Sequence, residues 1–193
     1  MWIFGYGSLM CENWEQEFGC LRKEEAELLS FRRDFNKAST SRWGTRSTPG
    51  PTLGLEPAEG FSCVGIAFEF PEHRSKRILS YLKQREGRDF TLAEGIVHLR
   101  SGGHVLARIP TNDRHGKSYI GNKTIAERVT MARVAAGRAG RCIDYVAKIR
   151  QELLRREIED PYVEQFWRAL SEYRGNSIAP NPRIPRTGKG ARR

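Results

Sequence analysis

The order of the hydrophobic patterns along the chain constrains its fold more than any other feature. Apolar residues occupy every second position of 64–70, which is typical of a strand with one buried face. After residue 124 the apolar residues recur every three or four positions, which is typical of amphipathic helices. Strands first and helices last favour an α+β fold.

Local signals place the expected elements. The apolar run Trp2-Ile3-Phe4 predicts a buried strand that enters a tight turn at 5–9. A hairpin is predicted over 96–109, turning through Ser101-Gly102-Gly103. Residues 34–60 are rich in Ser, Thr, Gly and Pro without a sustained period, so we expect a long loop there.

Helix signals occur before and after the predicted hairpin. Pro71-Glu72 opens a helix, and Gly87 stands where its C-terminal cap is expected. Later, 124–127 reads Thr-Ile-Ala-Glu, a capping box, and Asp160-Pro161 is a cap followed by a first-turn proline. These signals predict a helical C-terminal half.

Length and composition limit the class of protein. The 193 residues, 38% of them hydrophobic, suffice for one domain with a core. No stretch approaches the ~20 apolar residues of a membrane span, and the N-terminus lacks the pattern of a signal peptide. The cysteines form no C-x-x-C pair, which argues against a zinc site and a disulfide scaffold; they are Cys11, Cys20, Cys63 and Cys142. We therefore expect a reduced, cytoplasmic enzyme or binding protein.

The positive charge is concentrated at one end. Six of the ten net positive charges lie in residues 174–193, which leaves +4 for residues 1–173. The end segment contains several prolines and glycines, so we expect a domain over 1–173 and a basic, disordered tail over 174–193. A mildly basic body predicts no specific nucleic-acid partner. The sequence carries no signal for an oligomeric state.

Two features are candidates for chemistry. Gly5 and Gly7 flank Tyr6 directly after the predicted strand; such a turn can present backbone amides to an anion, although many turns need glycine for structure alone. In the helix expected after Pro71-Glu72, Glu86 shares the apolar face with Leu79 and Leu82. Burial and the negative end of that helix are expected to raise the pKa of Glu86, which makes it a candidate general base. An ion pair with a nearby Arg or Lys is the alternative.

The sequence also resembles a known family. Trp-Ile-Phe-Gly-Tyr-Gly-Ser-Leu at 2–9 and Tyr-Leu-x-x-Arg-Glu at 81–86 resemble the two signatures of the ChaC-type, glutathione-specific γ-glutamylcyclotransferases. Further blocks follow the family's order up to about residue 170, and the ordered set makes the resemblance specific. These blocks are Arg33-x-Phe35, Ser39, Gly44-Thr45, Pro49-Gly50, Gly65-Ile66-Ala67, Tyr119-Ile120-Gly121 and Gly140-Arg141 with Tyr145.

The resemblance implies a small mixed β-barrel or sheet flanked by helices, and a lyase reaction without cofactor or metal. In that reaction the γ-glutamyl unit of glutathione cyclises to 5-oxoproline and releases Cys-Gly. Glu86 is implied to accept the proton of the α-amino group, which then attacks its own γ-carbonyl. The residues implied to hold the γ-glutamyl end are Ile3, Phe4, Gly5, Tyr6, Gly7, Ser8, Leu9 and, as a hydrogen-bonding partner, Tyr145.

The sequence departs from the family pattern at three positions. Trp43 is inserted into an Arg-Gly-Thr motif, Pro51 replaces a basic residue, and Cys142 replaces an asparagine. These departures bear on substrate preference.

Three alternatives remain at this point. A Ser8 nucleophile with a histidine base is not favoured, because the Gly-x-Ser-x-Gly elbow is absent. A protein that binds γ-glutamyl compounds without turnover is the second alternative. A cyclotransferase for other γ-glutamyl peptides or γ-glutamylamines is the third.

Overall fold

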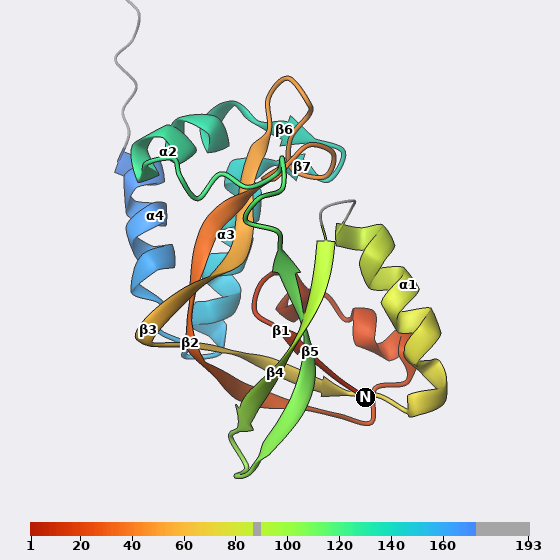
Figure 1. Ribbon diagram of the computed structural model, residues 1–193. Helices are drawn as coiled ribbons and strands as arrows, with labels where there is room; N and C mark the ends of the chain where they lie inside the picture. Colours follow the sequence, from red (N-terminus) through yellow and green to blue (C-terminus); the bar gives the residue numbers. More distant parts are fainter. Residues whose placement is uncertain (87–89, 173–193) are drawn as a thin grey trace, which may run out of the picture.

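The computed structural model describes residues 1–86 and 90–172, with only the backbone of Glu86 and Phe90. Five strands close into a barrel in the order β1-β3-β2-β4-β5, with helices packed outside it (Figure 1). The strands are β1 (Trp2–Gly5), β2 (Arg22–Ser39), β3 (Gly50–Glu69), β4 (Phe90–Leu99) and β5 (His104–Asn112). Strand β1 runs parallel to β5 and the other pairs are antiparallel. The expected α+β fold with a mixed barrel is confirmed.

Strand β1 lies between β3 and β5 in the barrel. Phe4 pairs with Ala67 of β3, and Trp2 pairs with Ala107 of β5. The side chains of Ile3 and Phe4 are fully buried, as a short apolar run predicts for a central strand. This strand therefore delivers the turn that follows it to one end of the barrel.

The long loop expected over 34–60 is wrong. Strands β2 and β3 form one antiparallel ribbon that pairs from Arg22 with Glu69 to Ser39 with Gly50, and the segment without secondary structure shrinks to residues 40–49. The apparent loop signals have structural roles in the ribbon. A Cβ at Gly54, for example, would lie 2.0 Å from the Asn36 Oδ1 atom. Register shifts between Leu29 and Phe31, and again before Lys37, disturb the alternation that marks a strand.

Helix α1 (Ser75–Glu86) covers one side of the barrel after the short 3-10 turn Glu72–Arg74. Ile78 and Leu82 on its inner face are fully buried, as the sequence predicts. The cap expected at Gly87 lies outside the described residues. The predicted hairpin is confirmed as β4 and β5.

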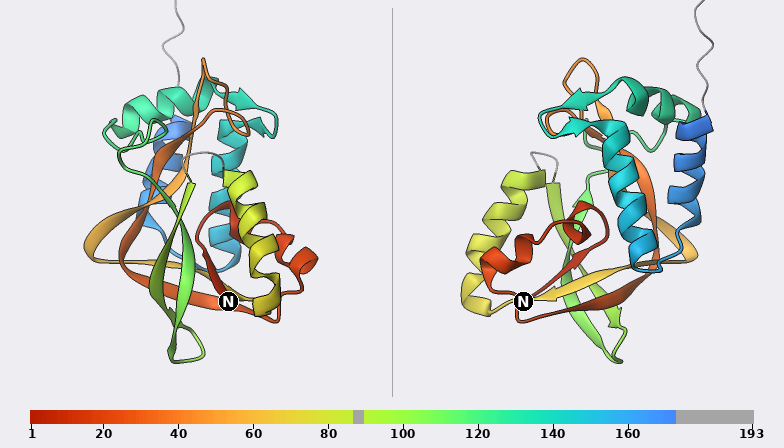
Figure 2. Two further views of the ribbon diagram at one scale, coloured as in Figure 1. Left: turned by 45° about the vertical axis from the view of Figure 1, so that its right-hand side comes forward. Right: turned by 180° about the vertical axis from the view of Figure 1, so that it is seen from behind.

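Three helices pack on the β2–β3 ribbon, as Figure 2 shows from behind. They are α2 (Ile125–Val134), α3 (Cys142–Arg155) and α4 (Pro161–Glu172). The capping box at α2 is present, since the Thr124 hydroxyl accepts from the Glu127 amide at 3.2 Å while the Glu127 carboxylate accepts from the Thr124 amide at 2.8 Å. Asp160 caps α4 by accepting from the Val163 amide at 2.9 Å.

The expectation of a helical C-terminal half is not confirmed. Strand structure continues to Asn112, the first C-terminal helix begins only at Ile125, and a small hairpin of β6 (Ala136–Gly137) and β7 (Gly140–Arg141) separates α2 from α3. Among the described residues, no helix is both long enough and apolar enough to cross a membrane.

Candidate active site

A cavity of about 770 Å³ opens at the end of the barrel where β1 leads into its turn. Its walls come from this turn, the 40–49 loop, the last turn of α1, the 113–124 segment, the β6–β7 hairpin and α3. The buried residues that line it are Tyr6, Gly7, Leu9, Thr52, Leu53, Pro110, Ile120 and Tyr145.

The turn after β1 is held from both sides. The Tyr6 hydroxyl donates to the Pro110 carbonyl at 2.7 Å, which ties the turn to β5. The Arg33 Nε atom donates to the Tyr6 carbonyl at 2.7 Å. Arg33 also donates to the Asp160 carboxylate at 3.0 Å and to the Val64 carbonyl. A guanidinium with only 1% of its side chain exposed therefore locks the backbone of the turn to β2, β3 and α4.

The two glycines of the turn have different environments. A Cβ at Gly5 would lie 3.0 Å from the Leu9 Cβ and 3.1 Å from the Phe68 ring, so Gly5 leaves room for core packing. A Cβ at Gly7 would have ordinary contacts with Leu53, at 3.6 Å, and with the Tyr145 hydroxyl, at 4.0 Å. Of these two glycines, only Gly7 lines the cavity, as Leu53 and Tyr145 do.

Arg85 joins the turn to α1. Its guanidinium donates to the Ser8 hydroxyl at 2.9 Å, the Tyr81 hydroxyl at 3.0 Å and the Glu12 carboxylate at 2.6 Å. Burial opposes the charge on Arg85, but the hydrogen bond and charge of Glu12 raise the pKa of Arg85 overall. Burial also opposes the charge on Glu12, whose pKa is nevertheless lowered by Arg85, Arg42 and Lys148. Both groups stay ionised near neutral pH, and a guanidinium cannot act as a base for Ser8.

Glu86 is the last residue of α1, and its side chain lies outside the part of the chain that the structure describes. The two residues before it, Gln84 and Arg85, both line the cavity. The end of α1 therefore meets the turn after β1 at one cavity, although the two signature segments lie more than 70 positions apart in the sequence.

Tyr145 comes from the first turns of α3. Its ring is 3% exposed and lies 5.2 Å, between ring centroids, from Trp43. Its hydroxyl accepts from the Leu53 amide at 3.1 Å. The hydroxyl is thereby fixed beside Gly7, 4.0 Å from the position that a Cβ on Gly7 would take.

The three departures from the family pattern meet near this tyrosine. The inserted Trp43 is the ring beside Tyr145, and the Cys142 thiol donates to the Pro51 carbonyl at 3.2 Å. Two of the departures thus contact each other, one turn of α3 before Tyr145. Of the three departures, only Trp43 lines the cavity.

The cavity brings together five of the predicted substrate-binding residues, which are Tyr6, Gly7, Ser8, Leu9 and Tyr145. It does not include Ile3, Phe4 or Gly5, which are buried in β1 behind it. Their substrate-binding role stays a prediction, and in the structure they position the turn.

Several lining residues were not identified from the sequence. Leu53 fell in the segment interpreted as a loop, and Arg85 stood in the second signature beside Glu86 without being assigned a role. Cationic residues of the cavity wall, such as Lys37 and Arg138, carried no signal because they are spread over the whole chain.

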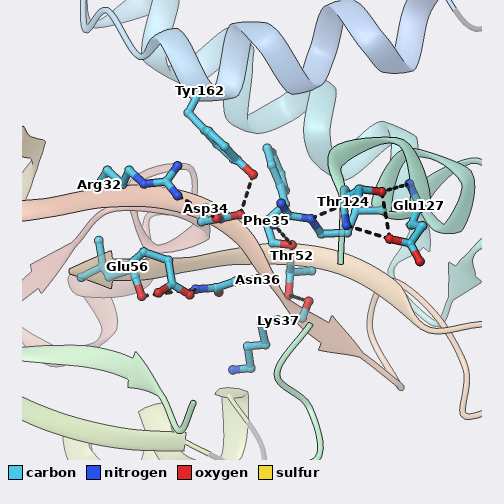
Figure 3. A network of polar contacts seen from close by, with 12 residues as sticks. Arg32, Asp34, Phe35, Asn36, Lys37, Thr52, Glu56, Thr124, Glu127 and Tyr162 are labelled. Carbon is cyan, nitrogen blue, oxygen red and sulfur yellow. Dashed lines mark hydrogen bonds and ion pairs between the residues drawn. The ribbon is translucent and has the colours of Figure 1, made fainter. Parts of the chain in front are cut away.

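A polar network supports the ribbon behind the cavity (Figure 3). The Asp34 carboxylate accepts from the Tyr162 hydroxyl at 2.7 Å and pairs with Arg128 of α2. Nearer the cavity, the Thr52 hydroxyl donates to the Lys37 carbonyl at 3.1 Å. The network fastens α2 and α4 to the strands that carry the lining residues.

Known proteins share this arrangement. The crystal structure of the yeast γ-glutamylcyclotransferase specific to glutathione superposes with a TM-score of 0.82 at 21% identity, over 93% of this chain and 99% of that one. The glutathione-specific γ-glutamylcyclotransferase of Saccharomyces cerevisiae is 23% identical over 228 residues, covering 90% of this chain and 97% of that protein. The γ-glutamylcyclotransferase 2-3 of Arabidopsis thaliana is 26% identical and covers 84% of each chain.

The fold is therefore that of the γ-glutamylcyclotransferases. A model of the family described as ChaC-like protein matches residues 1–173. The chain belongs to this family, as the two signature segments of the sequence indicate.

Proposed function

We propose that this protein is a γ-glutamylcyclotransferase that cleaves glutathione into 5-oxoproline and Cys-Gly. One observation carries the proposal: the turn after β1 and the last turn of α1, which hold the two signatures, line the same cavity. Family membership over residues 1–173 and relatives named for this activity support it.

The chemistry requires little beyond positioning. The α-amine of the γ-glutamyl unit attacks its own γ-carbonyl carbon, a ring C–N bond forms, and the bond to the cysteine nitrogen breaks. Because nucleophile and electrophile belong to one molecule, holding the substrate folded supplies much of the rate enhancement. Backbone amides of the turn at Gly7 and Ser8 are suited to an anionic group of the substrate, either its α-carboxylate or the developing oxyanion.

Glu86 is proposed as the proton acceptor. An α-ammonium group has a pKa of about 7.7–8.0 and must lose a proton before it can attack. A carboxylate at the end of α1 takes this proton and gives it to the leaving nitrogen, and it then takes the second proton that the ring nitrogen loses after the attack and passes it to the released amine. The reaction consumes no water, because the amine itself is the nucleophile. Arg85, held by Glu12 and bound to Ser8, fixes the turn relative to this end of the helix.

The cellular location of the protein and the boundaries of its catalytic domain are part of the same proposal. Four free cysteines in the described residues are compatible with a cytoplasmic enzyme in a reducing compartment. We place the catalytic domain at 1–173 and the basic segment 174–193 outside it.

The products of the reaction test this function. The purified protein is incubated with glutathione, and 5-oxoproline, Cys-Gly and free glutamate are quantified, with a γ-glutamylamine as a parallel substrate. Equimolar 5-oxoproline and Cys-Gly are expected. Free glutamate would indicate hydrolysis, and binding of glutathione without product would indicate a non-catalytic binding protein. Faster turnover of the γ-glutamylamine would indicate a different substrate class.

A further inference from the structure

The cavity wall is strongly cationic. Seven lining side chains carry a positive charge, and among the described residues no aspartate or glutamate lines the cavity. The cations are Lys37, Arg42, Arg46, Arg85, Lys117, Lys123 and Arg138. Arg85 and Arg42 contact Glu12, at 2.6 and 3.5 Å, so the positive charge of these two residues is partly balanced.

Arginines from two distant segments form one wall. The Arg138 amide donates to the Ser41 carbonyl at 3.0 Å, and the Ala139 amide donates to the Arg42 carbonyl at 2.8 Å. These bonds fasten the β6–β7 hairpin to the 40–49 loop, which lie side by side in Figure 1. Arg138 of the hairpin and Arg46 of the loop are thereby brought to the same wall.

Lysines line the cavity from a separate pair of segments. The Ala38 amide donates to the Ser118 carbonyl at 2.7 Å, so the end of β2 is joined to the 113–124 segment. Lys37 lies on the first of these segments, and Lys117 and Lys123 lie on the second. The positive charge is therefore built into two anchored walls.

Burial separates the cavity into an inner and an outer part. Tyr6, Leu9 and Tyr145 in the inner part are at most 8% exposed, whereas Arg46 and Arg138 are exposed. Neither of these arginines forms an ion pair with a described side chain, that is, with one in 1–85 or 91–172. The outer part thus offers positive charge that no ion pair within the described part of the chain neutralises.

We propose that Arg46 and Arg138 form a subsite for the carboxylate at the end of the leaving peptide. This inference rests on the proposed function. The γ-glutamyl end of glutathione carries one ammonium and one carboxylate, so this end is neutral overall. The net negative charge of glutathione therefore lies on the carboxylate of its glycine residue. With the γ-glutamyl end in the inner part, this carboxylate lies toward the exposed arginines. The subsite selects peptides with a terminal carboxylate over γ-glutamylamines, whose leaving group has none.

A comparison of glutathione with its glycine amide tests the subsite. We expect the wild type to favour the acid in kcat/KM by about tenfold, the effect of one charge-assisted hydrogen bond worth about 1.4 kcal/mol. The double variant Arg46→Gln with Arg138→Gln should lose at least about tenfold with glutathione and change little with the amide. Arg100→Gln is the matched control, since Arg100 follows β4 and does not line the cavity.

Equal turnover of acid and amide by the wild type would overturn the proposal. Equal losses for both substrates in the double variant would also overturn it, because the arginines would then only hold the loop. Calorimetric binding of both ligands in a Glu86→Gln background repeats the comparison without turnover. If no substrate releases 5-oxoproline, the proposed function fails, and the ratio of the two dissociation constants still decides the subsite.

Discussion

Arg33 offers the sharpest test of how the turn at the cavity is held. Its guanidinium donates to the Tyr6 and Val64 carbonyls and pairs with Asp160 at 3.0 Å, with its side chain 1% exposed. Arg33→Met removes every one of these donors. It leaves the Asp160 carboxylate, only 12% exposed, without the guanidinium that neutralises it.

The structure sets the size of the effect. Removing one partner of a buried ion pair costs about 3–5 kcal/mol. For a domain of this length each kcal/mol lowers Tm by about 2–4 °C, so Tm should fall by roughly 6–20 °C. The fall is measured by differential scanning calorimetry. Urea unfolding at a fixed temperature gives the free energy of unfolding independently.

Arg32→Met provides the matched control. Arg32 neighbours Arg33 on β2, but its side chain is 35% exposed and its ion pair with Asp34 is longer, at 3.5 Å. Its loss should cost no more than about 1 kcal/mol. If both variants unfold within a few degrees of each other, Arg33 does not anchor the turn.

Three further predictions concern the cavity and its surroundings. Gly7→Ala should lower kcat/KM for glutathione by about 10- to 100-fold with a small change in Tm. Gly5→Ala should instead cost about 1–3 kcal/mol of stability by overpacking. Equal Tm values for the two variants would refute this contrast. Tyr145→Phe leaves the Leu53 amide without its hydroxyl partner. Urea unfolding should therefore show a loss of about 1–3 kcal/mol in the free energy of unfolding, and steady-state kinetics should show a lower kcat/KM. An unchanged unfolding midpoint would contradict the role of this hydrogen bond. The lowered pKa of Glu12 stabilises the fold above the unfolded pKa, and this contribution is lost as the pH falls through the folded pKa. Below pH 4.5, the ordinary pKa of this group, the free energy of unfolding should therefore fall more steeply with decreasing pH in the wild type than in Glu12→Gln. Parallel plots of stability against pH for the two proteins would contradict this prediction.

Secondary structure could be predicted from the sequence where the signal depends on neighbouring residues. The apolar run at 2–4, the alternation at 64–70 and the capping box at 124–127 each depend on neighbouring residues, and each element lies where it was expected. The β2–β3 ribbon was missed because its bulges, glycines and prolines break the two-residue period. Its stability comes from pairing between segments, which no local pattern in 34–60 records.

In the candidate active site, too, local features were predicted from the sequence and contacts between distant segments were not. The glycine turn was found because it directly follows a recognisable strand. The difference between Gly5 and Gly7 depends on Phe68 and Leu53, which come from another strand. The cationic wall could not be predicted, because the backbone bonds that join the β6–β7 hairpin of Arg138 to the loop of Arg46 follow from the tertiary fold alone.

Turnover by Glu86→Gln tests the central claim most directly. Glutamine keeps the shape of the side chain but cannot accept the proton of the α-ammonium group. The account predicts that kcat for 5-oxoproline release falls by ~10²–10⁴-fold, while the variant stays folded and still binds glutathione. Glu94→Gln, the same change at a half-exposed carboxylate of β4 that pairs with Arg108, should keep wild-type kcat. Retention of more than about a tenth of wild-type kcat by Glu86→Gln, well short of the loss expected for a general base, would contradict the claim.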